Sequence, residues 1–332
     1  MPRKFKKFLV TGGSGFIGSS FIHHIFHKYC NLEYSDCCPD HMHFGASEKI
    51  EGIEVMNVDC LTYAGNPRNL DGIDQLENYY FSKINITDYS GIEGVFSEFK
   101  PQVVVHFAAE SHVDRSIHSG IEFVNSNVLG TQMLLDLSRE FEVELFLHVS
   151  TDEVYGSVEE GLATEEGRLL PSSPYSASKA SSDLLALSHH HTYGTPIIIS
   201  RCANNFGPRQ HEEKLIPKMI SRAKDGQKLP VYGSGKQIRN WIHVKDHCEA
   251  ISRLIGEGEI GEVYNVAGDL EISNIELIRD ILHRMGKTEG LIEHVDDRLG
   301  HDFRYGLDDG KIREMGWKPL ISIDDGLLGI IG

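Results

Sequence analysis

Short, strongly apolar runs alternate with amphipathic segments along the first half of the chain. The apolar runs KFLV, IEVMNV, VVVHFAA and ELFLHVS occupy residues 7–10, 53–58, 103–109 and 144–150. Runs of this kind, without regular polar alternation, are typical of strands buried on both faces. Helical patterns lie between them, for example at 87–99 and 124–140. Strands and helices in alternation predict an α/β fold with a doubly wound parallel sheet.

The pattern changes near residue 205. The run PIIISR at 196–201 continues the strand series, whereas later elements such as LPVYGSG at 229–235 are shorter and richer in proline, glycine and charge. We expect a nucleotide-binding domain over residues 1–203. Residues 204–332 are expected to form mainly a smaller α/β substrate lobe.

The segment 28–52 has no periodicity and is interpreted as an insertion. Thiols and imidazoles, the usual zinc ligands, are frequent in it: Cys30, Cys37, Cys38, His41 and His43. Their spacing matches no paired Cys-x-x-Cys or His-x-x-x-His pattern. A loop insertion is therefore favoured over a zinc site, and no metal is predicted.

Composition and charge restrict the partners of the protein. The 332 residues carry a formal net charge of −17, which disfavours nucleic acid. No apolar run approaches the ~20 residues of a membrane span. The basic N-terminus leads straight into a glycine-rich turn, which does not resemble a signal peptide. Six cysteines in a chain of this length predict no disulfide framework, so we expect the reducing cytoplasm.

A glycine-rich turn follows the first predicted strand, in FLVTGGSGFIGSSFI. Glycine lets the backbone approach a ligand closely, and a helix N-terminus offers free N–H groups and partial positive charge to a phosphate. Gly12, Gly15 and Gly18 lie between a strand and a helix, as this function requires. The turn therefore predicts a dinucleotide site of the Rossmann type.

An acidic residue at the end of the second strand normally holds the adenosine ribose, ~20 residues beyond the glycines. Asp59 has this position, with about twice the usual separation, and the insertion 28–52 accounts for the excess. A carboxylate there repels a 2′-phosphate, so NAD is predicted in preference to NADP. Arg68, the one nearby cation, lies well beyond the strand end.

The run PYSASKA places Tyr175 and Lys179 on one face of a helix. A lysine ammonium and a nicotinium cation would together lower the pKa of the phenol from ~10 toward neutrality. The tyrosinate could then take the proton of an alcohol that is being oxidised. This spacing is common on helix surfaces, but after a dinucleotide turn it indicates catalysis.

The run HVSTDEVYG ends an apolar strand with two adjacent carboxylates, Asp152 and Glu153. From the residues alone, a solvated turn and a catalytic acid pair are equally good interpretations.

Together these motifs resemble the extended short-chain dehydrogenase/reductase family, and STDEVYG resembles its nucleotide-sugar 4,6-dehydratase branch. The resemblance covers nearly the whole chain, through VTGGSGFIG, VDCLTYAGN, HFAAESHVDRS, SNVLGT, SPYSASKA, RCANNFGPRQHEEKLIPK, GSGKQIRNWIHVKDH, NVAG, DRLGHDFRY and GWKP. Epimerases of this fold typically lack both carboxylates. Nucleotide-sugar decarboxylases are similar to STSEVYG, which has no aspartate, so Asp152 is the discriminating residue.

The resemblance implies an NAD-dependent hydro-lyase that oxidises a nucleotide hexose, eliminates water and reduces the product again. It implies Glu153 as the base at C5, Asp152 as the acid at the 6-hydroxyl, and Thr151 beside Tyr175 at the 4-oxygen. The implied cofactor contacts are Gly12, Gly15, Phe16, Ile17, Gly18, Asp59, Thr62, Asn85, Ile86, Ala108, Ala109, Tyr175 and Lys179. The implied substrate contacts are Ser111, His112, Asn204, Lys214, Leu215, Arg239, Asn265, Arg298 and His301.

The implied substrate is dTDP-glucose, with UDP-glucose or another nucleotide hexose as the alternative. A non-catalytic NAD-binding regulator would be expected to lack part of the catalytic set, which is complete here. Four positions depart from the family pattern and leave the base and sugar open: Asn85 and Asn240 for aspartate, His243 for tyrosine and Leu299 for proline.

The resemblance also implies a homodimer through helices at 124–140 and 178–191. Relatives continue for about one more helical turn beyond GLLGIIG, where this sequence stops.

Overall fold

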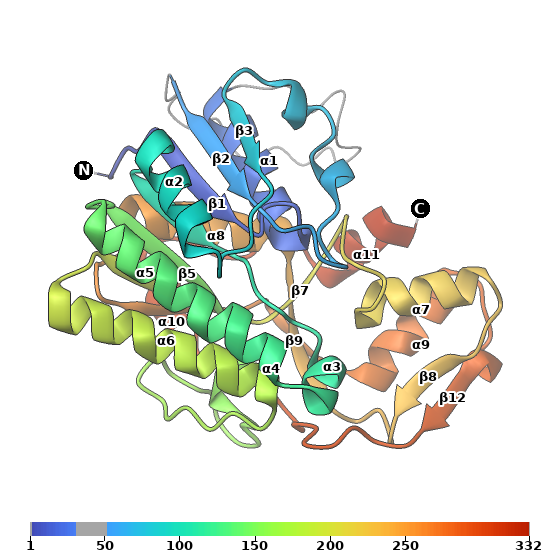
Figure 1. The fold of residues 1–332 in the computed structure, drawn as a ribbon. Coiled ribbons are helices and arrows are strands. Elements are labelled where there is room, and N and C mark those ends of the chain that lie inside the picture. The colour runs from blue at the N-terminus through green and yellow to red at the C-terminus, as the bar shows by residue number, and fades with distance from the viewer. Residues whose placement is uncertain (1, 31–51, 332) are drawn as a thin grey trace.

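A computed structural model describes residues 2–30 and 52–331. Within these residues, a seven-stranded sheet has the order β10-β6-β5-β4-β1-β2-β3, and all its pairs are parallel (Figure 1). Its strands are β1 (Lys7–Thr11), β2 (Glu54–Val58), β3 (Tyr79–Ser82), β4 (Val103–His106), β5 (Leu145–Thr151), β6 (Ile197–Cys202) and β10 (Val263–Val266). The strand order reverses between β1 and β4, which confirms the predicted doubly wound sheet.

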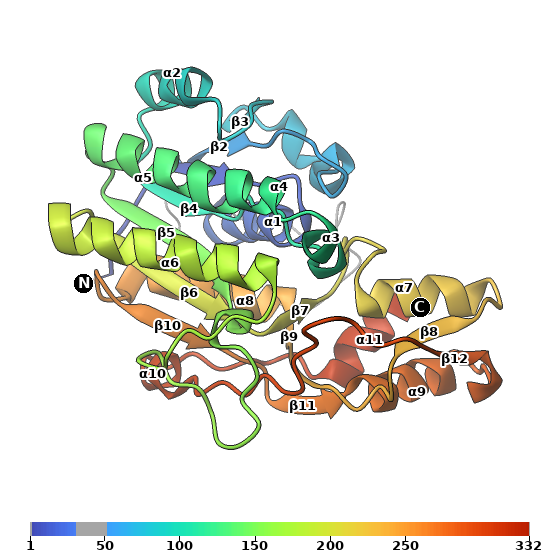
Figure 2. The same cartoon turned by 60° about the horizontal axis from the view of Figure 1, so that its bottom comes forward.

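Helices cover both faces of this sheet (Figures 1 and 2). The helices α1 (Phe16–Cys30) and α8 (Val244–Glu257) pack together on one face, and α2 (Tyr89–Phe99), α5 (Thr131–Glu140) and α6 (Pro174–Tyr193) cover the other. Successive residues of β1 enter opposite cores, since Phe8 and Val10 pack with α1 whereas Leu9 packs with α2 and α5. Burial on both faces explains the uninterrupted apolar runs in the sequence.

Local sequence sets the start and end of the long helix α6. Ser173 forms a capping box with Ser176, and Pro174 occupies the first turn, where its missing N–H costs nothing. Gly194 ends the helix in the left-handed conformation, at φ 71°. The predicted helix at 124–140 forms as a π-helical segment, η3 (Val124–Gly130), followed directly by α5.

A smaller lobe lies beside the carboxyl edge of the main sheet (Figure 2). It contains a three-stranded sheet of β11 (Leu270–Ser273), β9 (Ile238–His243) and β7 (Asn204–Phe206), and a pair of β12 (Ile292–Val295) with β8 (Leu229–Tyr232). Its helices are α7 (Leu215–Lys224), α9 (Asn274–Arg284) and α11 (Ile323–Ile331). These elements share one apolar core, around Phe206, Ile220 and Ile281.

The chain returns from this lobe to the main sheet, so the lobe does not take up all of residues 204–332. Helix α8 packs against α1, and β10 pairs in parallel with β6. The reason is the buried apolar strand around Val263 and Val266, which completes the edge of the sheet. Residues 244–266 therefore belong to the nucleotide-binding layer.

Most of the predicted insertion 28–52, with the candidate zinc ligands Cys37, Cys38, His41 and His43, lies outside the described residues. Over residues 2–30 and 52–331, no group of three or more metal-ligating side chains forms a metal site. In the same part of the chain, no helix has the length and apolar character to cross a membrane.

Candidate active site

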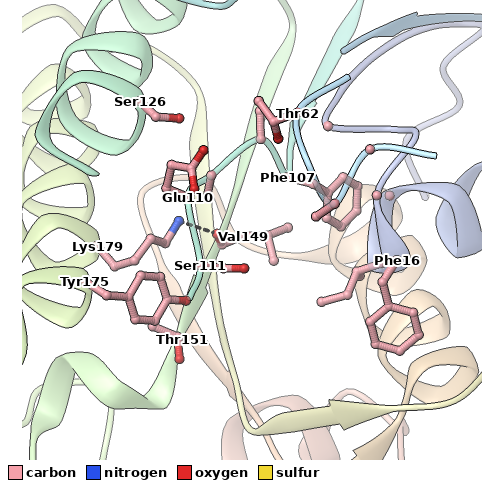
Figure 3. Close-up of a pocket in the computed structure, with 18 of the residues that line it drawn as sticks. Phe16, Thr62, Phe107, Glu110, Ser111, Ser126, Val149, Thr151, Tyr175 and Lys179 are labelled. Atoms are coloured by element: carbon pink, nitrogen blue, oxygen red, sulfur yellow. Dashed lines mark hydrogen bonds between the residues drawn. The ribbon is translucent and has the colours of Figure 1, made fainter. Parts of the chain in front are cut away.

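A cavity of about 940 Å³ lies at the carboxyl edge of the main sheet, where loops after β1, β2, β4 and β5 meet the start of the lobe (Figure 3). Ligands of doubly wound folds bind at this edge, beside the point where the strand order reverses. The predicted residues that line the cavity are Gly12, Gly15, Phe16, Ile17, Gly18, Asp59, Thr62, Asn85, Ile86, Ala108, Ala109, Ser111, Thr151, Asp152, Glu153, Tyr175, Lys179, Asn204 and Lys214. The fold thus brings the separate motifs into one site.

The three predicted glycines of the turn have different physical roles. Gly12 has φ +69°, and a Cβ there would lie 2.7 Å from the Cα of Ala108. A Cβ on Gly18 would lie 2.3 Å from the carbonyl oxygen of Gly12, so both glycines are needed to build the turn. A Cβ on Gly15 would meet only the Gly12 oxygen, at 3.2 Å, and would otherwise occupy the cavity. The open face at Gly15 fits the close approach of a dinucleotide pyrophosphate.

Gly15→Ala is therefore expected to weaken NAD binding by about tenfold or more, with little change in thermal stability. Calorimetric titration with NAD and a thermal melt measure the two effects. Gly94→Ala is the matched control, because a Cβ at this position in α2 would contact nothing within 4 Å. NAD affinity equal to that of the wild type in Gly15→Ala would contradict the assignment of the turn.

Asp59 directly follows β2 and faces the glycine-rich turn. Its carboxylate accepts hydrogen bonds from the Ser14 N–H at 2.9 Å and the Leu61 N–H at 2.8 Å. Burial raises the pKa of Asp59, and these two donors oppose that rise. The bonds hold a carboxylate at the cavity wall, where the sequence predicts the ribose contact. Arg68 lies exposed in η1 (Pro67–Leu70) and does not line the cavity.

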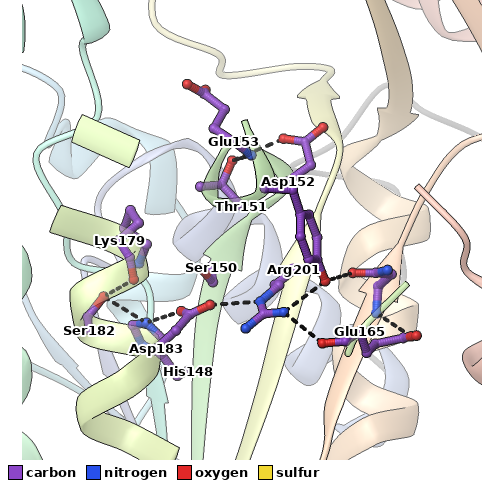
Figure 4. A network of polar contacts seen from close by, with 12 residues as sticks. His148, Ser150, Thr151, Asp152, Glu153, Glu165, Lys179, Ser182, Asp183 and Arg201 are labelled. Atoms are coloured by element: carbon purple, nitrogen blue, oxygen red, sulfur yellow. Dashed lines mark hydrogen bonds and ion pairs between the residues drawn. The ribbon is translucent and has the colours of Figure 1, made fainter. Parts of the chain in front are cut away.

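The two adjacent carboxyls lie in η4 (Asp152–Tyr155), a single tight turn that begins where β5 ends (Figure 4). The Thr151 hydroxyl caps this turn by accepting a hydrogen bond from the Glu153 N–H at 3.3 Å. Asp152 is only 2% exposed, and Glu153 is partly buried. Both line the cavity, so the interpretation as a solvated turn is wrong: β5 is the buried centre of the sheet and delivers its last residues inside the molecule.

Different surroundings separate the two carboxyls electrostatically. Burial, and then the charge of Glu153, raise the pKa of Asp152 to about 8. Burial also raises the pKa of Glu153, but the cations of Lys214, Arg239 and Arg298 act against that rise. Near neutral pH, Asp152 therefore keeps its proton, whereas the three cations favour the charged form of Glu153 against the effect of burial.

Tyr175 and Lys179 lie in the first turns of α6 and face the cavity (Figure 3). The Lys179 ammonium donates a hydrogen bond to the Val149 carbonyl oxygen at 2.8 Å, and burial lowers its pKa to about 8. Burial, followed by the charge of Glu153, raises the pKa of Tyr175 well above its ordinary value. The predicted lowering of the phenol pKa includes a nicotinium cation, and it stays a prediction for the protein with NAD bound.

The pKa values of Asp152 and Lys179 predict how the reaction depends on pH. Each group is protonated below about pH 8 and loses its proton above it. If both protons are required, the turnover rate should fall above this pH by up to about a hundredfold per pH unit. Asp152→Asn removes one titrating group, so its residual rate should fall by about tenfold per unit. Identical slopes in the two pH profiles would contradict the role of Asp152.

The predicted cations of the substrate site lie around Glu153, as their effect on its pKa indicates. Lys214 donates to the Ser111 carbonyl oxygen at 2.7 Å, and Arg298 pairs with Asp114 at 2.6 Å. Arg239 is buried and its guanidinium lies 4.2 Å from the centre of the Tyr305 ring.

Arg239 and Arg298 do not line the cavity, and three further predicted contacts also lie outside its lining. His112 precedes α3 (Val113–His118) and pairs with Glu213 at 3.6 Å, and His301 pairs with Asp297 at 2.7 Å. Leu215 begins α7 and packs on the core of the lobe.

Asn265 does not lie where the sequence places it. It is a fully buried residue of β10 and does not line the cavity. Its side-chain amide donates to the carbonyl oxygens of Ala163 and Asp308, both at 2.9 Å, and its oxygen accepts from the Tyr155 hydroxyl at 2.8 Å. With its polar atoms used inside the protein, Asn265 has no free group for a nucleotide.

Comparison with known proteins identifies the family. Residues 42–328 match the family described as GDP-mannose 4,6 dehydratase. The chain belongs to this family. The low-salt glycan biosynthesis protein Agl12 of Haloferax volcanii is 46% identical over 96% of this chain and 95% of its own length. The dTDP-glucose 4,6-dehydratase of Streptomyces niveus is 44% identical over 97% of this chain and 90% of its own length.

The solved structure of a dTDP-glucose 4,6-dehydratase has the same fold. The crystal structure of DesIV, a dTDP-glucose 4,6-dehydratase from Streptomyces venezuelae with NAD and dTDP bound, superimposes with a TM-score of 0.87. It is 43% identical and covers 96% of this chain and 94% of its own. The predicted resemblance to nucleotide-sugar 4,6-dehydratases is thereby confirmed.

Glu110 and Tyr63 are among the cavity residues that sequence reasoning within the family motifs missed. Glu110 lies in HFAAESHVDRS, and burial raises its pKa. Tyr63 lies in VDCLTYAGN, and its hydroxyl donates to Glu213 at 3.3 Å. Both motifs were visible in the sequence, but no chemistry pointed to these two side chains.

Proposed function

We propose that this chain is a dTDP-glucose 4,6-dehydratase, which converts dTDP-glucose to dTDP-4-keto-6-deoxyglucose and water. The observation that carries the proposal is the pair of adjacent carboxyls in the cavity, Asp152 and Glu153, of which Asp152 keeps its proton up to about pH 8. An elimination needs one acid and one base on the same substrate. The 44% identity to the dTDP-glucose 4,6-dehydratase of Streptomyces niveus over nearly the whole chain supports this substrate.

The cofactor of the proposed reaction is NAD, which is bound in the related DesIV structure. The open face at Gly15 and the carboxylate of Asp59 fit the pyrophosphate and ribose of this dinucleotide. When bound, NAD accepts a hydride from the sugar and later returns it, so it is regenerated in each turnover. The remaining predicted cofactor contacts in the cavity are Phe16, Ile17, Thr62, Asn85, Ile86, Ala108 and Ala109.

In the proposed first step, Tyr175 takes the proton of the sugar 4-hydroxyl while the C4–H bond is broken. The Thr151 hydroxyl lies at the same end of the cavity and orients the 4-oxygen (Figure 3). Below about pH 8 the Lys179 ammonium keeps its charge and stabilises the tyrosinate that forms. This cation is fixed in place by its bond to Val149.

In the proposed second step, the new ketone at C4 makes the C5–H bond acidic, and Glu153 takes that proton. Asp152 gives its proton to the 6-hydroxyl, the C6–O bond breaks, and water leaves as the C5–C6 double bond forms. The buried Oδ2 of Asp152 has no hydrogen-bond partner among the described residues, which leaves it available to a substrate hydroxyl. Glu153 returns a proton to C5 when C6 is reduced.

The diphosphate of the substrate is proposed to bind Lys214, Arg239 and Arg298. Lysine and arginine are the usual partners of phosphate oxygens, and an acidic protein needs such a local concentration of positive charge. Ser111 and Asn204 line the cavity nearby and are proposed to contact the sugar. The same reaction on UDP-glucose is the alternative, since none of these side chains is proposed to contact the nucleotide base and distinguish thymine from uracil.

The substrate is tested by incubating the purified protein with dTDP-glucose, UDP-glucose and GDP-mannose in separate reactions. The absorbance of a 4-keto sugar in alkali reports the product. Product from dTDP-glucose at the highest kcat/KM is expected. If only UDP-glucose or only GDP-mannose gave product, that sugar would be the substrate in place of dTDP-glucose. If none of the three gave product, the proposed dehydratase activity would be refuted.

A homodimer through α5 and α6 is proposed as well. These helices lie side by side at the surface, and apolar residues nearby are exposed, with Ile121 at 62% and Leu184 at 58%. Analytical ultracentrifugation at micromolar concentration should give twice the mass of one chain, and a monomer would contradict the dimer.

A cytoplasmic location is also proposed; the free thiols Cys60, Cys202 and Cys248 support it.

A further inference from the structure

A buried polar network lies behind the cavity and joins three elements of the candidate site (Figure 4). Its centre is Arg201 on β6, which is 2% exposed. The guanidinium Nε donates to the Oδ2 of Asp183 on α6 at 2.8 Å, and Nη1 donates to the Tyr155 hydroxyl of η4 at 2.8 Å. One planar cation thus holds a helix and a turn at fixed positions.

Both partners of Arg201 are adjacent to proposed catalytic residues. Asp183 lies one helical turn beyond Lys179 on α6. Tyr155 is the last residue of the tight turn that begins with Asp152 and Glu153. The network therefore connects the element that carries the acid and base to the element that carries the redox pair.

The Tyr155 hydroxyl is held from two sides. It accepts from Arg201 and donates to the Asn265 oxygen at 2.8 Å, while the Arg201 guanidinium also lies 5.0 Å from the centre of the Tyr155 ring. Asn265 is itself fixed through the carbonyl oxygens of Ala163 and Asp308. Because the donor and the acceptor that bind this hydroxyl are both fixed, the Tyr155 ring is held in one orientation.

The ion pair at the centre of the network is maintained inside the protein. Burial acts to raise the pKa of Asp183, but the hydrogen bond from His148 and the charge of Arg201 lower it overall. Replacing a buried ion pair by apolar residues often costs no stability, whereas such pairs can define one arrangement of the surrounding elements. None of Arg201, Asp183 and Tyr155 lines the cavity, so they do not touch the ligands directly.

We propose that Arg201 and Tyr155 are positioning residues that hold η4 against α6 and β6, and so fix Asp152 and Glu153 at the substrate. The inference rests on the proposed function for its catalytic consequence. Displacement of a catalytic group by a fraction of a bond length slows the step that this group performs. The loss should therefore fall on the elimination, which uses η4.

Tyr155→Phe tests this inference, because it removes only the hydroxyl that joins Arg201 to Asn265. The kcat for dTDP-glucose should fall by about tenfold or more, with KM and NAD affinity unchanged. Exchange of the C5 hydrogen of the 4-keto product in D2O, followed by NMR, should slow by a similar factor, since Glu153 performs it. The matched control is Tyr264→Phe on β10, which loses a buried hydroxyl that accepts from the Glu259 N–H at 2.8 Å, away from η4.

Amide hydrogen exchange provides a readout that needs no turnover. In Tyr155→Phe the amides of residues 152–156 should exchange faster than in Tyr264→Phe, even if the wild type converts none of the three sugars. Faster amide exchange in a protein without dehydratase activity would refute the proposed function but support the positioning role. Unchanged exchange, or unchanged kcat and C5 exchange in an active enzyme, would overturn the positioning role itself.

Discussion

Glu153→Gln is expected to reduce the dehydration of dTDP-glucose by about 10²–10⁴-fold, while substrate and NAD still bind. The amide has nearly the same size but cannot take the C5 proton. Because Tyr175 and Lys179 are intact, the sugar should still be oxidised at C4, so the reduced cofactor should accumulate. Absorbance of the reduced nicotinamide in a stopped-flow experiment measures this accumulation, and product formation is measured in parallel.

Glu144→Gln is the control for this substitution. Glu144 is exposed and directly precedes β5, whereas Glu153 follows the opposite end of this strand. It should behave as the wild type in both measurements. Product formation by Glu153→Gln within a few-fold of the wild-type rate would show that another group is the base at C5.

Tyr175→Phe is expected to reduce product formation by a similar factor, about 10²–10⁴-fold, but for a different reason. The phenol is the proposed acceptor of the 4-hydroxyl proton, so the variant should stop before oxidation. Neither product nor reduced cofactor should then accumulate, in contrast to Glu153→Gln. The same stopped-flow measurement therefore distinguishes the two roles.

Removal of the Tyr175 hydroxyl leaves the ring and its edge contact with Phe123, at 6.3 Å between centres, so the fold should be kept. Tyr264→Phe again serves as the buried control. Accumulation of reduced cofactor by Tyr175→Phe at the wild-type rate would exclude the phenol as the proton acceptor.

The sequence was informative wherever a local pattern has one physical cause. Strands buried on both faces give uninterrupted apolar runs, so β1, β4, β5 and β6 could be found without the structure. The turn at Gly12 and Gly18 was equally clear, because only glycine fits there. Both features depend on residues close together in the chain.

Features that depend on distant residues could not be derived in the same way. The raised pKa of Asp152 follows from its burial and from the charge of Glu153, and the three cations that act on Glu153 come from separate parts of the chain. The internal bonds of Asn265 depend on residues about 40 and 100 positions away along the chain, and no local pattern shows them. The raised pKa of Tyr175 reflects the same dependence on burial.

The most direct test of the account uses dTDP-glucose labelled with deuterium at C4, converted by the wild-type protein in ordinary water. If one bound cofactor carries the hydrogen while Asp152 and Glu153 remove water, the product should carry the deuterium in its C6 methyl group and a solvent hydrogen at C5. Mass spectrometry and NMR locate both. Loss of the deuterium to solvent, or its retention at C4 in an unreduced or epimerised sugar, would contradict the account.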